Sequence, residues 1–105
     1  MRPEYHSFYL AAAIPKPMDS SEYLRAVEER LAPMSPMVKP VIERQLAQMG
    51  LTRDMLSPRQ AEMLVRRVSG ALAMFMGPSG AETARSMMMK ELRKRAPEYF
   101  ARQGL

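Results

Sequence analysis

Apolar side chains recur at intervals of three and four residues along most of this chain, a spacing typical of amphipathic helices rather than strands. The first such segment is residues 20–31, with apolar positions at Tyr23, Leu24, Val27 and Leu31. Residues 19–22 have the form of a capping box, in which Asp19 accepts from first-turn amides and Glu22 reaches back. Pro33 ends this predicted helix near Leu31.

A second helix is expected from Ser35, which is placed to cap it, with Pro36 in its first position. Its apolar positions are Val38, Val41, Ile42, Leu46 and Met49. Pro40 lies early in this segment, so it either kinks the helix or delays its true start. Gly50 is placed to end the helix, because glycine readily adopts the left-handed conformation found after helix ends.

The clearest helix start lies at residues 57–60, where a serine cap, a proline and a glutamine follow one another. We expect this helix to extend from Pro58 to about Met76 and to be central to the fold. Its apolar stripe consists of Ala61, Leu64, Val65, Val68, Leu72 and Phe75. Residues 71–76 are apolar on every side, so either the rest of the fold or another chain must cover both faces.

Gly77 and Pro78 terminate that helix, and residues 79–82 (Ser-Gly-Ala-Glu) have the form of a further capping box. The helix that follows should reach about Arg95. Its inward-facing positions are Ala81, Ala84, Met88 and Leu92. Pro97 then permits a last short helix, from which Tyr99 and Phe100 are expected to reach the core.

The pattern predicts an all-α fold: a compact bundle of about four main helices with short loops. Residues 1–18 are assigned to an N-terminal arm or short helix, and residues 19–105 to one helical domain. The apolar runs at 8–14 and 71–76 are far shorter than the roughly 20 residues that cross a bilayer. No membrane span is therefore expected, and a cytoplasmic location is favoured.

Cysteine, histidine and paired carboxylates, which often carry catalysis or bind metals, are absent or scarce. The chain has no cysteine and one histidine, His6, which lies near the N-terminus. Adjacent carboxylates such as Glu28 and Glu29 point about 100° apart on a helix, so they do not form a catalytic pair. We expect no enzyme activity, no metal site and no cofactor.

Methionine is the most unusual component, with twelve residues, three of them consecutive at 87–89. Its flexible side chain suits both irregular cores and adaptable binding surfaces, and both interpretations remain open. Neighbouring helical residues diverge by about 100°, so Met87, Met88 and Met89 do not all face one core. The residues expected to bind a protein partner are Met74, Met76, Met87, Met89, Tyr99 and Phe100.

The net charge of +5 resides in residues 51–105, which hold ten Lys/Arg and five Asp/Glu, because residues 1–50 hold six of each. Such a basic half favours either an acidic partner or simply a solvated face. If the partner is nucleic acid, the expected contacts are Arg66, Arg67, Arg85, Lys90, Arg93, Lys94 and Arg95.

The sequence thus favours a non-catalytic protein–protein interaction module: an adaptor, regulatory or assembly subunit with a methionine-rich apolar surface. Its partner would be another protein or a second copy in a homodimer or larger homo-oligomer. The alternative is a nucleic-acid-binding helical domain that uses the basic C-terminal half.

Overall fold

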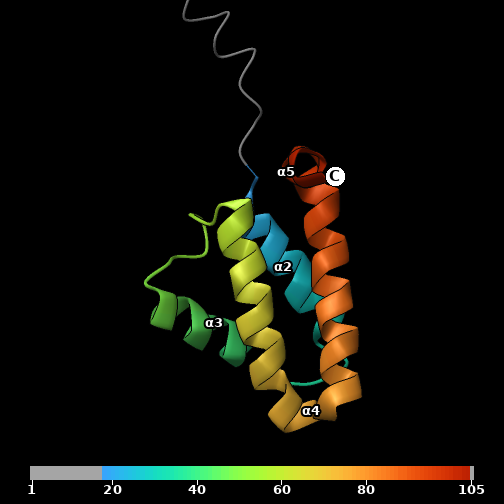
Figure 1. Ribbon diagram of the computed structural model, residues 1–105. Coiled ribbons are helices and arrows are strands. Elements are labelled where there is room, and N and C mark those ends of the chain that lie inside the picture. Colours follow the sequence, from blue (N-terminus) through green and yellow to red (C-terminus); the bar gives the residue numbers. More distant parts are fainter. Residues whose placement is uncertain (1–17, 105) are drawn as a thin grey trace, which may run out of the picture.

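The computed structural model describes residues 18–104, which form four α-helices and the loops between them. The helices are α2 (Ser20–Leu31), α3 (Val38–Met49), α4 (Pro58–Arg95) and α5 (Pro97–Gly104), with no strand in this range. α4 contacts each of the other three helices and is the central element. The expected all-α bundle is confirmed (Figure 1), whereas His6 and most of the expected N-terminal arm lie outside the described residues.

α2 starts and ends where the sequence predicts. The Asp19 carboxylate accepts a hydrogen bond from the backbone N–H of Glu22 at 3.1 Å, which satisfies one free donor of the first turn. The second half of the expected capping box does not form. The Glu22 carboxylate instead lies 3.5 Å from the guanidinium of Arg95. The inward face is as expected, since Tyr23, Leu24, Val27 and Leu31 are all buried.

α3 begins later than its serine–proline signal predicts. Ser35 Oγ accepts from the N–H of Met37 at 3.1 Å, but helical geometry starts only at Val38. This start places Pro40 third in the helix, where its missing N–H is one that no helical carbonyl would receive. A start at Pro36 would place Pro40 in the second turn, where that missing donor would break a helical bond. The predicted end is confirmed, because Gly50 is left-handed with φ 70°.

α4 opens with the complete capping box that residues 57–60 predict. Ser57 Oγ accepts from the Gln60 N–H at 3.1 Å, and Gln60 Oε1 accepts from the Ser57 N–H at 2.9 Å. Gly77 then interrupts the helix with φ 77° and ψ 168°, a backbone conformation essentially restricted to glycine. Figure 1 shows the chain folding back at this point, so that a first arm (58–76) and a second arm (78–95) lie side by side.

The second arm begins at Pro78 rather than after a cap at Ser79. Proline suits the first helical position because its ring fixes a helical φ and its missing donor costs nothing there. Ser79 therefore lies inside the helix, where its carbonyl accepts from the Thr83 hydroxyl at 3.1 Å. The inward face of this arm is as expected, since Ala81, Ala84, Met88 and Leu92 are buried.

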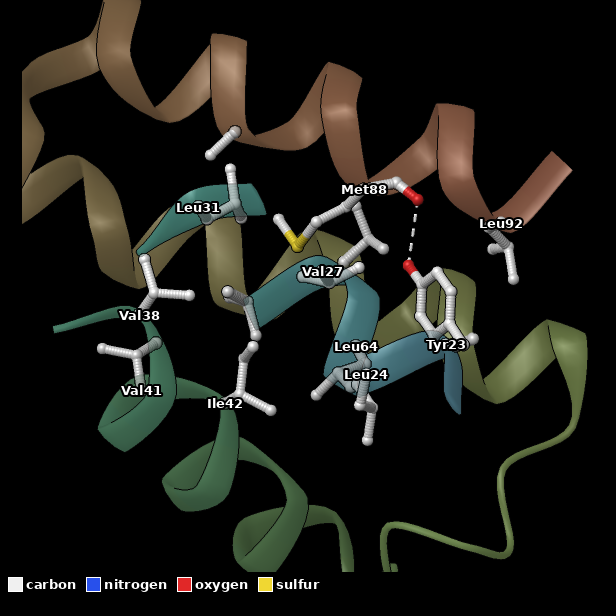
Figure 2. Close-up of a cluster of buried hydrophobic side chains, with 14 of the residues drawn as sticks. Tyr23, Leu24, Val27, Leu31, Val38, Val41, Ile42, Leu64, Met88 and Leu92 are labelled. Atoms are coloured by element: carbon white, nitrogen blue, oxygen red, sulfur yellow. Dashed lines mark hydrogen bonds between the residues drawn. The ribbon is translucent and has the colours of Figure 1, made fainter. Parts of the chain in front are cut away.

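Buried side chains from α2, α3 and both arms of α4 meet in one core (Figure 2). Within it the Tyr23 hydroxyl donates to the backbone carbonyl of Met88 at 3.0 Å, along the dashed line of Figure 2. Burial, and secondarily the negative charge of Glu91, raise the pKa of Tyr23, so the hydroxyl keeps its proton. This bond joins α2 to the second arm.

Polar contacts fix the connector 51–57 against α2. Ser20 Oγ donates to the carbonyl of Arg53 at 2.7 Å and accepts from the N–H of Leu56 at 3.1 Å. The guanidinium of Arg53 donates to both carboxylate oxygens of Glu28, each at 2.8 Å. These contacts hold the start of the first arm of α4 in place.

Among residues 18–104 one carboxylate is buried, that of Glu91, which is only 3% exposed. Arg95 Nε donates to it at 2.6 Å, and Arg30 Nε of α2 lies 3.7 Å from its other oxygen. The hydrogen bond from Arg95 outweighs desolvation and lowers the pKa of Glu91. Glu91 is therefore a charged link between α2 and the second arm.

Candidate protein-interaction surface

The first arm of α4 ends in two large apolar side chains that stand in solvent. Met74 is 85% exposed and Phe75 is 56% exposed. The expectation that Phe75 continues the buried stripe is wrong, although the other five residues of that stripe are buried. Because the chain turns back at Gly77, no other helix covers the last turn of the first arm on this side. The described residues therefore leave part of the apolar segment 71–76 uncovered.

Beside these side chains lies an apolar hollow of about 400 Å³ between α3 and the first arm, which we call the interaction groove. Its lining consists of Met37, Pro40, Val41, Arg44, Gln45, Ala71, Met74 and Phe75. Most of these residues are apolar, and Arg44 and Gln45 supply the polar part.

The local sequence explains why a groove forms here. Pro40 and Val41 are compact side chains in the first turn of α3, and Ala71 on the first arm is small, so neither wall fills the space. Gly77 then carries the chain toward the second arm instead of across this hollow. Met74 and Phe75 are left as one wall of the groove.

The other methionines expected to bind a partner are more enclosed. Met76, Met87 and Met89 are partly buried and pack against the core, and Met88 between them is fully buried. Neighbours in the run 87–89 do diverge, as the helical geometry predicts, but the fold accommodates all three. Of the four methionines expected at a binding surface, only Met74 projects into solvent.

The two aromatic residues of α5 are also partly buried. Tyr99 and Phe100 pack against the core, as expected, with ring centroids 5.0 Å apart in an edge-to-face arrangement. The Tyr99 hydroxyl donates to Glu62 of the first arm at 2.7 Å, and the Arg93 guanidinium lies 5.7 Å from the centre of the Phe100 ring. Both residues therefore attach α5 to α4 and lie apart from the interaction groove.

Cationic side chains border the groove. Arg44 is exposed and forms part of the lining. Arg67 on the first arm donates to the side-chain oxygens of Gln45 at 2.8 Å and Gln48 at 2.9 Å, which bridges α3 and α4. Both partners of Arg67 are neutral amides, and among residues 18–104 neither arginine forms an ion pair. The rim therefore keeps a positive charge.

The basic residues considered for nucleic-acid contact do not share one face. Arg67 lies at the α3 boundary, whereas Arg95 is engaged with Glu91 and Glu22 on the α2 side. At 3.6 residues per turn, Lys94 points about 180° away from Arg85 on the second arm. Arg85 also has a carboxylate, that of Glu82, at 3.7 Å. The fold thus disperses the set Arg66, Arg67, Arg85, Lys90, Arg93, Lys94 and Arg95 over several sides of the bundle.

A second hollow, also of about 400 Å³, lies between the start of α4 and α5, with Met18, Leu56 and Tyr99 among its lining. The interaction groove lies about 24 Å further along the first arm, at 1.5 Å of rise per residue. The two hollows therefore lie near opposite ends of the first arm.

Within residues 18–104 no group of three or more His, Cys, Asp or Glu side chains is arranged to hold a metal ion. The adjacent carboxylates have separate surroundings: Glu28 binds Arg53, and Glu29 lies 3.8 Å from Arg25. Among the helices described, none is both long and apolar enough to cross a membrane.

Comparison with known proteins gives no relative: no family model, no curated protein and no solved structure matches this chain. The assignment of the interaction groove as a candidate site therefore depends only on the geometry described above. Sequence reasoning identified Met74 but missed Phe75, Met37 and Arg44 as residues of the groove. The all-round apolar segment 71–76 was the available signal for Phe75, because an evenly apolar turn cannot be buried on every side by one neighbour.

Proposed function

We propose that this chain is a non-catalytic protein-interaction module, an adaptor, regulatory or assembly subunit, which binds an amphipathic helix of a partner protein in the interaction groove. The observation that carries the proposal is the exposure of Met74 and Phe75 beside an apolar hollow. Exposed apolar side chains that adjoin such a hollow are typical of binding surfaces rather than of scattered surface residues.

A helix is the occupant that best fits the walls of this groove. The walls are themselves helices, α3 and the first arm of α4, and the side chains of a third helix can pack between two others as ridges between grooves. Apolar residues spaced three and four apart on the incoming helix would contact both walls. The methionines support this reading, since Met37 and Met74 can adjust to side chains of different shape.

The energy available is sufficient for a specific complex. Full burial of a large apolar side chain contributes roughly 1.5–3 kcal/mol, and Met74 and Phe75 both gain burial when the groove is filled. Each 1.4 kcal/mol changes an affinity about tenfold. These two residues are therefore expected to be the energetic centre of the interface.

We further propose that the protein is cytoplasmic, because a chain without cysteine needs no oxidising compartment for disulfide formation. A homodimer remains a prediction. The nucleic-acid alternative receives less support, because the basic side chains that it needs are dispersed and partly engaged with carboxylates.

The proposal is tested with a synthetic helical peptide that carries Leu at positions i, i+3, i+4 and i+7 and neutral Gln elsewhere. Binding is followed in protein labelled with ¹³C at the methionine methyl groups. We expect the peptide to shift the methyl signals of Met37 and Met74. The signal of Met55 should not move, because this methionine, 71% exposed, lies in the connector at the far end of the first arm.

The matched variants are Met74→Ser combined with Phe75→Ser, and Met55→Ser as the control. The double variant should weaken binding at least about tenfold, whereas the control should bind like the unaltered protein. Equal binding by all three proteins, or a titration that moves Met55 as much as Met74, would contradict the proposal.

A further inference from the structure

We infer that the interaction groove selects partner helices whose apolar face is flanked by acidic side chains. This inference rests on the proposed function, which it deepens by naming the chemistry of the partner. It is carried by two arginines among residues 18–104: Arg44, which lines the groove, and Arg67, which binds the lining residue Gln45.

The first observation is the lining itself. Among residues 18–104, this lining contains one charged residue, Arg44, and no carboxylate. Arg44 is exposed and has no ion-pair partner among residues 18–104. Its guanidinium is therefore available to a carboxylate on an incoming helix, with up to five N–H donors in a planar fork.

The second observation is Arg67, which stands on the other wall. It is exposed, and it spans the boundary between α3 and the first arm through Gln45 and Gln48. The two amides orient the guanidinium but leave its charge uncompensated. Gln45 belongs to the groove lining, so this oriented charge adjoins the groove. A helix in the groove would thus meet a cation from each wall.

The nearest candidate to cancel this charge faces elsewhere. Glu43 precedes Arg44 in α3, and helical geometry separates the two side chains by about 100°. The negative charge of Glu43 acts on Arg53 in the connector, where it is one of the smaller causes that raise the pKa of Arg53, after the hydrogen bond to Glu28. Glu43 is not among the residues that line the groove, where Arg44 is the charged side chain.

The same charges argue against a second copy as the main occupant. A two-fold interface brings the same patch of each chain together, so Arg44 and Arg67 of one copy would approach those of the other. With a net charge of +5 per chain, such pairing would add repulsion over the whole surface. An acidic helix meets attraction at the same positions.

The experiment uses three peptides that share the Leu-based apolar face and differ only in the flanking residues, which are Glu, Gln or Lys. At low salt the Glu peptide should bind roughly fivefold more tightly than the Gln peptide, and the Lys peptide should bind more weakly than either. At about 0.5 M salt the three affinities should converge, since exposed charges are then screened over a few ångströms.

Charge reversal provides the matched variants. Arg44→Glu should remove the preference for the Glu peptide or turn it toward the Lys peptide. Lys90→Glu changes the net charge equally but lies on the second arm, outside the groove lining, so it should keep most of the preference. If Lys90→Glu removes the preference as fully as Arg44→Glu, the effect is long-range and the inference is overturned.

Failure of the inference can be told apart from failure of the proposed function. Equal affinity for the three peptides, together with loss of binding in the Met74→Ser, Phe75→Ser variant, overturns the charge preference and leaves the groove as the site. Absence of binding for every peptide overturns both. Sedimentation equilibrium tests whether a second copy of the chain occupies the groove instead. A dimer that the same double variant dissociates, and that does not bind the Glu peptide, would overturn the acidic helix in favour of a second copy.

Discussion

The two methionine-rich stretches of α4, residues 74–76 and 87–89, differ in burial although both are apolar. Residues 87–89 pack against the core, with Met88 fully buried, whereas Met74 and Phe75 project into solvent. The difference lies in what stands opposite each stretch. α2 faces the second arm and is hydrogen-bonded to it through Tyr23, whereas the end of the first arm borders the interaction groove, which α3 lines but does not fill. A high methionine content therefore does not by itself mark a binding surface.

The largest expected difference in stability is between two variants, each of which shortens a methionine in one of the two stretches. Met88→Ala removes buried side-chain volume beside Tyr23 and Leu92, so the free energy of unfolding should fall by about 2–5 kcal/mol. Met74→Ala removes an exposed side chain and should change stability by less than about 0.5 kcal/mol. Urea unfolding followed by far-ultraviolet circular dichroism measures both. Similar losses for the two variants would mean that Met74 is covered in solution.

The glycine between the two arms provides the second comparison. Gly77→Ala forces a side chain into φ 77° and ψ 168°, and it should destabilise the fold by about 1–3 kcal/mol. Gly70→Ala lies on a helical exposed face with nothing within 4 Å of the added carbon, so it should stabilise by about 0.5–1 kcal/mol. The two thermal unfolding midpoints should move in opposite directions. A stable Gly77→Ala variant would show that the turn between the arms can take another form.

The third comparison is the pH dependence of stability, which depends on the buried Glu91 of the second arm. The pKa of Glu91 is lowered in the folded protein, chiefly by the hydrogen bond from Arg95, so its contribution is present above the ordinary value near 4.5. That contribution is lost as the pH falls through the lower folded value. Glu91→Gln should cost about 1–3 kcal/mol at pH 7, since both arginine partners remain partly exposed, and the variant should lose less on acidification. An unchanged pH dependence would contradict this account.

The smallest expected effect concerns the hydrogen bond between α2 and the second arm. Tyr23→Phe removes the donor to the Met88 carbonyl while it keeps the ring in the core, and it should cost about 0.5–1.5 kcal/mol. Double-mutant unfolding with Met88→Ala would test whether the two changes are coupled. Strict additivity would show that the bond contributes independently of the packing around Met88.

Much of the fold could be predicted because its signals are local. The cap at Asp19, the capping box at Ser57 and the left-handed end at Gly50 involve residues at most a few positions apart. Periodicity likewise identified the inward face of each helix. The errors at Ser35 and Ser79 arose where a proline or glycine nearby moved the start of the helix, so two local signals competed.

The candidate site was less predictable because it depends on neighbours that are distant in the sequence. Phe75 and Leu72 are both apolar and lie on adjacent parts of one helix, yet Leu72 is buried whereas Phe75 is 56% exposed. Arg95 and Arg44 are both basic, but Arg95 meets Glu91 and Glu22 whereas Arg44 has no carboxylate partner in the described chain. No spacing rule within one helix distinguishes these cases.

The sequence by itself determined the helices of this protein, the caps at Asp19, Ser57 and Gly50 and most of the core residues, because backbone capping and side-chain periodicity act within a few turns. It also determined the scarcity of cysteine and histidine and the excess of positive charge. Only the tertiary structure decided which methionines are covered, which arginines pair with a carboxylate, and where an apolar groove remains. Those outcomes depend on the fold-back at Gly77 and on which helix then lies opposite each face, which is a property of the whole chain.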